Sequence, residues 1–217
     1  MPTAKPVRYL TSNAKMRKDN ILAFGIPAYK TESGRLTCPA AAECLKGCYA
    51  KQGFYVMPNV ARAQETRYAL TKSKAFVTTM VAEIQKRKPA VVRIHDSGDF
   101  YSREYLEKWL EIVRACPETR FYAYSKMIPL FKPAPGSGLR FNPPSNFKIV
   151  FSYGGKYDFM INRETDNHSV VFSTVDELQK AGYVDCHERD YTFMDGVQKV
   201  GLVYHGFTSK AWKAGVA

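Results

Sequence analysis

The chain has 217 residues, 45% hydrophobic and 24% charged, which is enough apolar material to bury a core and too much for a disordered tail. Its 32 Lys and Arg outnumber its 20 Asp and Glu, and the resulting net charge of +12 favours an anionic partner such as nucleic acid. The first 20 residues carry charges and prolines where a secretory signal needs an apolar run, and no stretch has the length of a membrane span. We therefore expect a cytoplasmic protein with no membrane partner.

The positive charge is concentrated in the first third of the chain. Residues 1–75 hold 13 basic and 4 acidic side chains, so this segment carries +9 of the +12. Basic side chains that precede a predicted strand near residues 21–26 are expected to face phosphate, with an aromatic residue among them for base stacking. They are Lys5, Arg8, Lys15, Arg17 and Lys18, and the aromatic residue is Tyr9. The alternative is a solvated basic surface without a partner.

Three cysteines follow this strand in a short loop. Cys38, Cys44 and Cys48 are separated by five and three residues. With five cysteines and no export signal, disulfides are the least expected use, and soft thiolates select iron–sulfur clusters or zinc. Zinc sites usually pair two ligands closely, whereas one irregular loop can hold three corners of a cubane cluster. The spacing therefore favours a 4Fe–4S cluster, with zinc and unligated thiols as alternatives.

The loop leaves the fourth corner of a cluster to another ligand. Cys186 lies in a polar segment without a core pattern and is the favoured ligand, with His187 or His205 as alternatives. Cys116 ends a predicted amphipathic helix and is interpreted as a small buried hydrophobic residue. Four protein ligands would leave no iron open, and the cluster would then be structural or redox-active.

From residue 74 onward the chain alternates helix and strand. A helix is predicted over 74–88, a strand over 91–95, and a helix that begins after the cap Ser102. Tyr105, Leu106, Trp109, Leu110 and Val113 share one face of this last helix.

Further strands are predicted over 120–124, 148–152, 170–172 and 201–204, with a capping box at residues 174–177 and an irregular loop over 131–146. This alternation predicts an α/β fold, an open or partial β/α barrel of parallel strands. It is expected to form a single domain over 1–217, with a basic, cluster-binding region over 1–75 and β/α units over 90–206.

Polar side chains recur at the carboxyl ends of the predicted strands, where α/β folds place their sites. Period-two alternation puts Arg93 and His95 on one face of the sheet. For Asp96 and Asp99 the alternative is a turn or cap role, and for His95 a hydrogen-bonded core imidazole. The candidate site residues are His95, Asp96, Gly98, Asp99, Ser125, Lys126, Ser152 and His205.

From about residue 20 to residue 206 the chain resembles the phage "gene product eighty-eight" family. The resemblance rests on the cysteine loop ending Cys-Tyr-Ala, the block Arg-Ile-His-Asp-Ser-Gly-Asp-Phe-Tyr-Ser, the Phe-Tyr-Ala-Tyr-Ser-Lys strand and the closing Gly-Leu-Val-Tyr-His-Gly. It implies a phage or prophage protein that works in the cytoplasm of an infected bacterium.

More distantly, the order of cysteine loop, helix and strand ending in Gly-Asp resembles the radical S-adenosylmethionine enzymes, which fold as partial β/α barrels. In those enzymes three and then two residues separate the cysteines, whereas in this chain five and then three residues separate them. The resemblance implies S-adenosylmethionine as a cofactor, with Gly98 and Asp99 in place of a Gly-Gly-Glu segment and with Ser125, Ser152 and His205 also binding the cofactor.

Three functions follow from these patterns. The favoured one is a phage iron–sulfur protein that binds or processes nucleic acid. In a processing enzyme, Asp96 and Asp99 would hold a divalent metal, Lys126 would neutralise phosphate charge and His95 would assist. The second is a radical S-adenosylmethionine-type enzyme with an open cluster iron, and the third is a zinc-stapled binding module.

Overall fold

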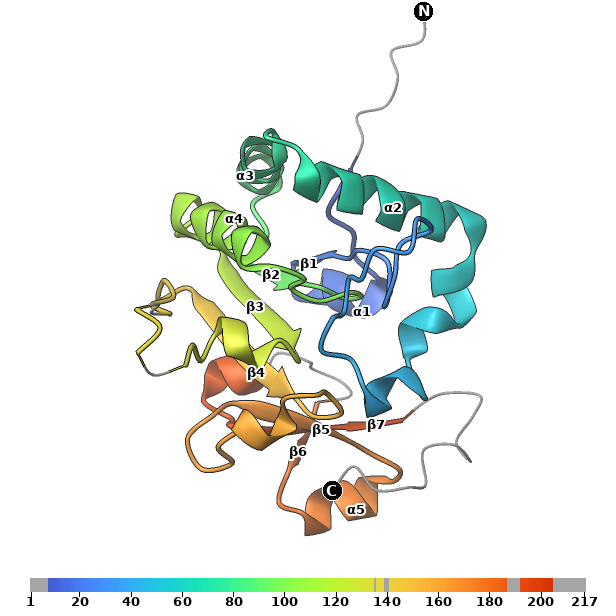
Figure 1. Cartoon of the computed structure of the whole chain (residues 1–217), viewed down its shortest axis with the longest axis vertical. Helices are drawn as coiled ribbons and strands as arrows, with labels where there is room; N and C mark the ends of the chain where they lie inside the picture. Colours follow the sequence, from blue (N-terminus) through green and yellow to red (C-terminus); the bar gives the residue numbers. More distant parts are fainter. Residues whose placement is uncertain (1–7, 135, 139–140, 187–191, 205–217) are drawn as a thin grey trace, which may run out of the picture.

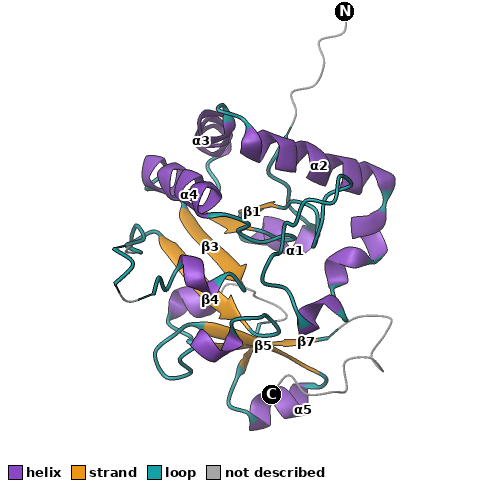
Figure 2. Ribbon diagram, viewed as in Figure 1, coloured by secondary structure: helices purple, strands orange, loops and turns teal. Residues whose placement is uncertain are grey.

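One parallel sheet organises the structure. The computed structural model describes residues 8–134, 136–138, 141–186 and 192–204 (Figure 1). Seven strands pair in the order β1-β2-β3-β4-β5-β7-β6, and every pairing is parallel. The sheet curls into a half-barrel with helices outside it (Figure 2). This confirms the predicted α/β class and the open, barrel-like arrangement of parallel strands.

The strands are β1 (Ile21–Phe24), β2 (Val91–Ile94), β3 (Arg120–Ser125), β4 (Phe147–Ser152), β5 (His168–Phe172), β6 (Val184–Asp185) and β7 (Lys199–Val203). The helices are α1 (Ala14–Lys18), α2 (Pro58–Lys72), α3 (Phe76–Arg87), α4 (Arg103–Ala115) and α5 (Val175–Lys180). Over the described residues of 131–146 there is no helix or strand, as predicted for that loop.

Helix α4 forms as the sequence predicts. The Ser102 hydroxyl accepts the N–H of Tyr105 at 3.2 Å, and Lys108 pairs with Glu104 at 2.8 Å one turn apart. All five residues of the predicted apolar face are buried. Trp109 packs edge-on against Phe24 of β1, with the ring centroids 5.2 Å apart, so the helix covers the outer face of the sheet.

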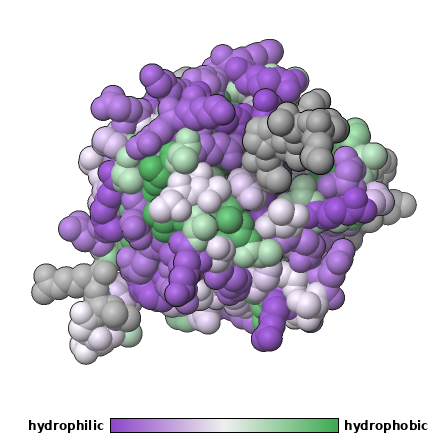
Figure 3. All heavy atoms as spheres, turned by 90° about the horizontal axis from the view of Figure 1, so that it is seen from above, coloured by the Kyte–Doolittle hydropathy of each residue, from purple (hydrophilic) through white to green (hydrophobic). Residues whose placement is uncertain are grey.

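Helix α3 covers the same face beside α4. It buries Phe76, Met80 and Ile84, and it ends where Lys88 adopts a left-handed conformation just before Pro89. Seen from the side of α2 and α3, the molecule shows a mostly hydrophilic surface around one apolar area (Figure 3). Among the described residues no helix has the length and apolar character needed to cross a membrane.

Helix α2 was not predicted, because the residues it buries are polar. Gln64, Arg67 and Thr71 are 5%, 8% and 1% exposed. Arg67 donates from Nε to the Tyr9 carbonyl at 2.7 Å and from NH1 to the Gly25 carbonyl at 3.5 Å. The helix is therefore attached to the end of β1 by hydrogen bonds rather than by an apolar stripe.

The inner face of the sheet has an apolar part and a polar part. Its apolar cluster is made by residues of α1, of the strands β1, β2, β3, β4 and β7, and by the residue after β6, namely Met16, Ile21, Ala23, Val91, Tyr122, Val150, Cys186 and Val200. Arg93 and Tyr124 follow on the same face toward the carboxyl ends of β2 and β3. The guanidinium carbon of Arg93 lies 5.6 Å from the centre of the Tyr124 ring.

Candidate functional site

The cysteine loop, residues 38–48, lies across the carboxyl edge of the sheet. The N–H of Cys44 donates to the Gly154 carbonyl at 3.1 Å, and the N–H of Lys156 donates to the Ala40 carbonyl at 2.8 Å. The Lys156 ammonium adds a 2.8 Å bond to the Pro39 carbonyl. Because the loop starts from β1 and these partners follow β4, it spans the ends of β2 and β3.

Two glycines make this close contact possible. Gly154 has φ +95°, and a Cβ on it would lie 3.2 Å from the Cys44 Cβ; a Cβ on Gly155 would lie 2.9 Å from the Lys126 Cβ. The Asp158 carboxylate fixes the pair by accepting the N–H groups of Gly154 at 2.8 Å and Gly155 at 2.9 Å. A side chain at either glycine would push the cysteine loop away from the sheet.

The three thiols of the loop lie within electrostatic reach of one another. Cys38, Cys44 and Cys48 are half-buried and form no disulfide. Burial, the Asp99 carboxylate and the other two thiols raise the pKa of Cys38 to about 12, although the N–H of Tyr29 donates to its sulfur. Burial also raises the pKa of Cys48, and Lys126 and Lys51 act in the opposite direction. The thiols thus converge beside two ammonium groups.

This donor set does not resemble a mononuclear zinc site. Within the described ranges, no group of three or more His, Cys, Asp or Glu side chains is arranged to hold a metal ion. A zinc staple needs four donors around one ion, whereas the corners of a cubane cluster are held by thiolates set further apart. Soft thiolates bind zinc as well as iron–sulfur clusters, so the choice between the two for this loop stays a prediction.

Cys186 lies away from these thiols. It is fully buried in the apolar cluster of the inner face, where its sulfur donates to the Gly201 carbonyl at 3.1 Å. The groups that shift the pKa values of Cys38 and Cys48 do not include it. These described contacts of Cys186 are with the apolar cluster and β7, and its role as the fourth ligand stays a prediction. The alternatives His187 and His205 lie outside the described residues. Cys116 is buried, as its interpretation as a core residue requires.

Asp99 is a buried structural link at this edge. Its Oδ1 accepts the N–H of Phe100 and the hydroxyl of Ser125, both at 2.7 Å, and its Oδ2 accepts the N–H of Lys126 at 2.9 Å. Burial raises the pKa of its carboxyl, and these three bonds oppose the rise. Asp99 and Ser125 therefore hold the ends of β2 and β3 together. Both carboxylate oxygens of Asp99 thus accept hydrogen bonds from the protein, and its predicted pairing with Asp96 around a divalent metal stays a prediction.

His95 leaves the inner face that strand alternation predicts for it. Its φ is +69°, which redirects the chain, so the ring packs 4.6 Å from the centre of Phe100 in the outer core. Nε2 lies 2.9 Å from the Tyr105 hydroxyl, while Nδ1 has no hydrogen-bond partner among the described residues. Burial and the nearby Arg93 lower its pKa to about 3. His95 is thus a neutral core imidazole, and its predicted catalytic role is not supported by this placement.

Asp96 lies at the polar end of the inner face, among side chains that the sequence analysis did not select. Tyr55 donates to its Oδ2 at 3.4 Å, and Tyr49 donates to its backbone carbonyl. Arg93 approaches the Tyr49 hydroxyl at 3.5 Å. Tyr49 directly follows Cys48, and this adjacency was the available signal for its place in the site. Together these groups form a charged and phenolic wall beside the cysteine loop.

Lys126 and Ser152 form the other side of this edge. The Lys126 ammonium donates to the Ser152 hydroxyl at 2.7 Å, so the structure brings these two candidate residues together at the ends of β3 and β4. Gly98 has a backbone role, because its φ is +81° and a Cβ there would lie 2.3 Å from a side-chain carbon of Ile26.

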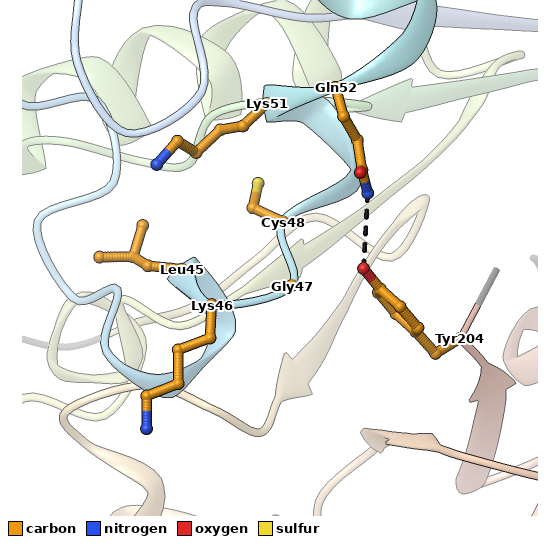
Figure 4. A pocket seen from close by; sticks show the side chains of 7 residues that line it. All are labelled: Leu45, Lys46, Gly47, Cys48, Lys51, Gln52 and Tyr204. Carbon is orange, nitrogen blue, oxygen red and sulfur yellow. Dashed lines mark hydrogen bonds between the residues drawn. The ribbon is translucent and has the colours of Figure 1, made fainter. Parts of the chain in front are cut away.

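A cleft of about 200 Å³ opens next to Cys48. In Figure 4 the Cys48 sulfur points toward Leu45 and Lys51, while Lys46 points away from it and pairs with Glu43. Gln52, four residues after the cysteine loop, donates to the Tyr204 hydroxyl at 3.5 Å. This bond connects the segment that follows the loop with the residue that follows β7. The cleft thus gives a ligand access to at least one of the three thiols.

The family follows from a match that covers nearly the whole chain. A family model described as gene product 88 matches residues 5–214. The chain belongs to the gene product 88 family. It is 32% identical over 103 residues to the "Gene 88 protein" of Mycobacterium phage L5 and 29% identical over 103 residues to that of Mycobacterium phage D29.

Each of these two matches covers 42% of the chain and 43% of the relative, so the chain spans less than half the length of the curated relatives it matches. No solved structure matches the chain. The predicted relationship to a phage family is confirmed, while the cluster, the cofactor and the nucleic-acid partner stay predictions.

Proposed function

We propose that the chain is an iron–sulfur protein in which Cys38, Cys44 and Cys48 hold a 4Fe–4S cluster that has one iron without a protein ligand. The observation that carries the proposal is the separation of the cysteines into two environments. Three thiols influence one another at the carboxyl edge of the sheet, and Cys186 is buried in an apolar cluster with its sulfur bonded to Gly201. Three ligands are the number that leaves a cubane corner open.

The chain's own residues support an anionic group at this position. Burial raises the pKa of Cys48, and Lys126 and Lys51 oppose that rise and so favour the thiolate, which is the form that binds metal. Cys38 is harder to deprotonate because it is buried near Asp99, so the bond of its thiolate to iron would have to offset that cost. Gly154 and Gly155 hold the loop at a fixed height over the sheet. These features suit a cluster that is assembled into a preformed loop.

An open iron implies a small ligand bound next to it, and we propose S-adenosylmethionine, which the distant resemblance implies. When bound, the cluster would supply an electron and a coordination site for that ligand. The wall beside the loop offers opposite charges for a zwitterion, because the Arg93 guanidinium lies 3.5 Å from the Tyr49 hydroxyl and the Asp96 carboxylate lies 3.4 Å from the Tyr55 hydroxyl. The Lys126 ammonium and the Ser152 hydroxyl are further polar groups for such a ligand.

Anaerobic purification followed by metal analysis tests the proposal. We expect a brown protein with about four iron and about four sulfide per chain, whose reduced electron paramagnetic resonance spectrum changes when S-adenosylmethionine is added. Cys116→Ala is the matched control, because Cys116 is a buried thiol remote from the loop in the apolar core. A colourless protein that contains zinc would replace the proposal with the zinc-stapled module. A cluster whose spectrum ignores S-adenosylmethionine would contradict the open iron.

A further inference from the structure

A second concave site lies at the opposite end of β1 from the cysteine loop. A groove of about 550 Å³ is lined by the buried residues Leu10, Ile21 and Leu22, and the last two are the first residues of β1. The polar side chains that line it are Arg8, Thr11, Ser12, Arg17, Asn20 and Arg87. We call it the arginine groove. The cysteine loop follows the carboxyl end of β1, so the two sites do not share residues.

The groove is built by pairing across the open edge of the sheet. Thr11 and Ala23 exchange backbone hydrogen bonds of 2.9 and 2.7 Å, which lay the segment before α1 along β1. The Ser12 hydroxyl donates to the Ile21 carbonyl at 2.8 Å, and the Asn20 amide donates to the Lys88 carbonyl at 3.1 Å. The groove walls are thus fixed before any ligand binds, which lowers the entropic cost of binding.

The charge around the groove is strongly positive. Residues 8–20 and 83–88 contain seven basic and two acidic side chains. Of the two acids, Glu83 is already engaged. It accepts the N–H groups of Tyr9 at 3.0 Å and Leu10 at 3.1 Å, and it pairs with Arg87 at 2.8 Å. The other acid, Asp19, caps the end of α1. Arg8 and Arg17 are exposed and have no ion-pair partner in the described part of the chain.

The groove offers charge without a surface for base stacking. Tyr9, predicted as a stacking residue, is half-buried with its ring packed against the outer core, and its carbonyl accepts Arg67. This placement does not favour the predicted stacking role of Tyr9, which stays a prediction. Among the described lining residues there is no aromatic side chain, so the groove can recognise phosphate oxygens but has no platform for a base.

We infer that the arginine groove binds the phosphates of a nucleic-acid backbone without reading the base sequence, with Arg8 and Arg17 as the principal contacts. Guanidinium groups hold phosphate oxygens with two parallel hydrogen bonds, and the flanking Lys15 and Lys18 on α1 extend the positive surface beyond the groove. This inference goes beyond the proposed function, since the groove lies apart from the thiols. A polymer bound there leaves the carboxyl edge of the sheet accessible.

Fluorescence anisotropy of a short labelled oligonucleotide, as single strand and as duplex, tests the inference with the full chain. Affinity should fall steeply between about 50 and about 200 mM NaCl, independently of base sequence. The double variant Arg8→Gln with Arg17→Gln should bind about 10-fold more weakly at the lower salt, and the slope of the logarithm of affinity against that of salt should shrink by about 1 to 2. Circular dichroism verifies that the variant is folded.

The matched control removes the same charge elsewhere. Lys180→Gln with Lys199→Gln changes exposed lysines of α5 and β7, near the other edge of the sheet, and should reduce affinity by less than about 2-fold. An equal loss of affinity in both double variants would show that net charge alone attracts the polymer, and it would overturn the assignment of the arginine groove as the binding site. Absence of binding at low salt would also overturn the inference. Displacement of the oligonucleotide by inorganic phosphate at equal ionic strength would overturn it too, because it would identify a small phosphate ligand.

Failure of this inference is distinguishable from failure of the proposed function. Cys44→Ala removes a cluster ligand without touching the groove, so it should lose iron and keep the wild-type affinity for the oligonucleotide.

Discussion

The hydroxyl of Ser125 donates a 2.7 Å hydrogen bond to Oδ1 of the buried Asp99, which joins the ends of β3 and β2 directly beneath the cysteine loop. The N–H of Asp99 in turn donates to the Thr37 carbonyl at 3.0 Å, next to Cys38. Asp99 therefore links two strand ends through its carboxylate and the start of the cysteine loop through its backbone N–H. This link explains how an irregular loop can hold its cysteines in a constant position.

Asp99→Asn should destabilise the fold by about 1–3 kcal/mol. Each carboxylate oxygen of Asp99 accepts a backbone N–H, from Phe100 on one side and Lys126 on the other. Whichever way an amide turns, its NH₂ group faces one of these donors and leaves it unsatisfied. Urea unfolding measures the loss, with Asp176→Asn on the exposed surface of α5 as the control. An Asp99→Asn protein as stable as the control would refute the bridging role.

Gly154→Ala should lift the cysteine loop and lower the iron content of the protein. The added Cβ would lie 3.2 Å from the Cys44 Cβ on a backbone with φ +95°, so both strain and contact oppose it. Gly182→Ala is a matched control, because Gly182 has φ +75° with nothing within 4 Å of the added atom. Both variants carry a strain of about 1 kcal/mol, but only Gly154→Ala should lose iron. Equal iron contents would mean that the loop does not depend on its contact with Gly154.

His95 should make the protein less stable in mild acid. The pKa of His95 is about 3 in the folded chain and 6.5 in the unfolded chain. Below pH 6.5 the unfolded state therefore binds a proton that the folded state does not bind. The contribution of neutral His95 to the free energy of unfolding is fully present above pH 6.5 and decreases as the pH falls toward 3. His95→Asn tolerates the left-handed backbone and cannot titrate. Between about pH 7.5 and 5 its loss of unfolding free energy should be smaller than that of the wild type by about 2 kcal/mol. Identical pH profiles in urea unfolding would contradict this role.

Residues with an undisturbed local pattern were predictable from the sequence. The face of α4 from Tyr105 to Val113 and its Ser102 cap both follow from spacing within one helix, and the strands followed from short apolar runs. The polar ends of these strands, Ser125, Lys126 and Ser152, were found because parallel strands present their ends at one edge. The cysteine loop was recognisable because three thiols in eleven residues have no packing explanation.

The remaining features depend on contacts between distant segments. Helix α2 attaches through buried Arg67 and Gln64, which a search for apolar stripes cannot detect. His95 changes face because of a single positive φ, which breaks the alternation that predicted its direction. Cys186 has polar neighbours in sequence, yet its N–H pairs with the Gly201 carbonyl, and this places its thiol in the apolar cluster. The polar strand ends were therefore predictable, but the surroundings of His95 and Cys186 were not.

The iron and sulfide contents of two matched variants, Cys44→Ala and Cys186→Ala, test the central claim most directly. Each variant removes one thiol, the first from the loop at the carboxyl edge and the second from the apolar cluster of the inner face. After anaerobic purification, Cys186→Ala should keep the wild-type iron and sulfide contents, and Cys44→Ala should lose most of both. If Cys186→Ala loses as much iron as Cys44→Ala, Cys186 is a cluster ligand and the open iron does not exist.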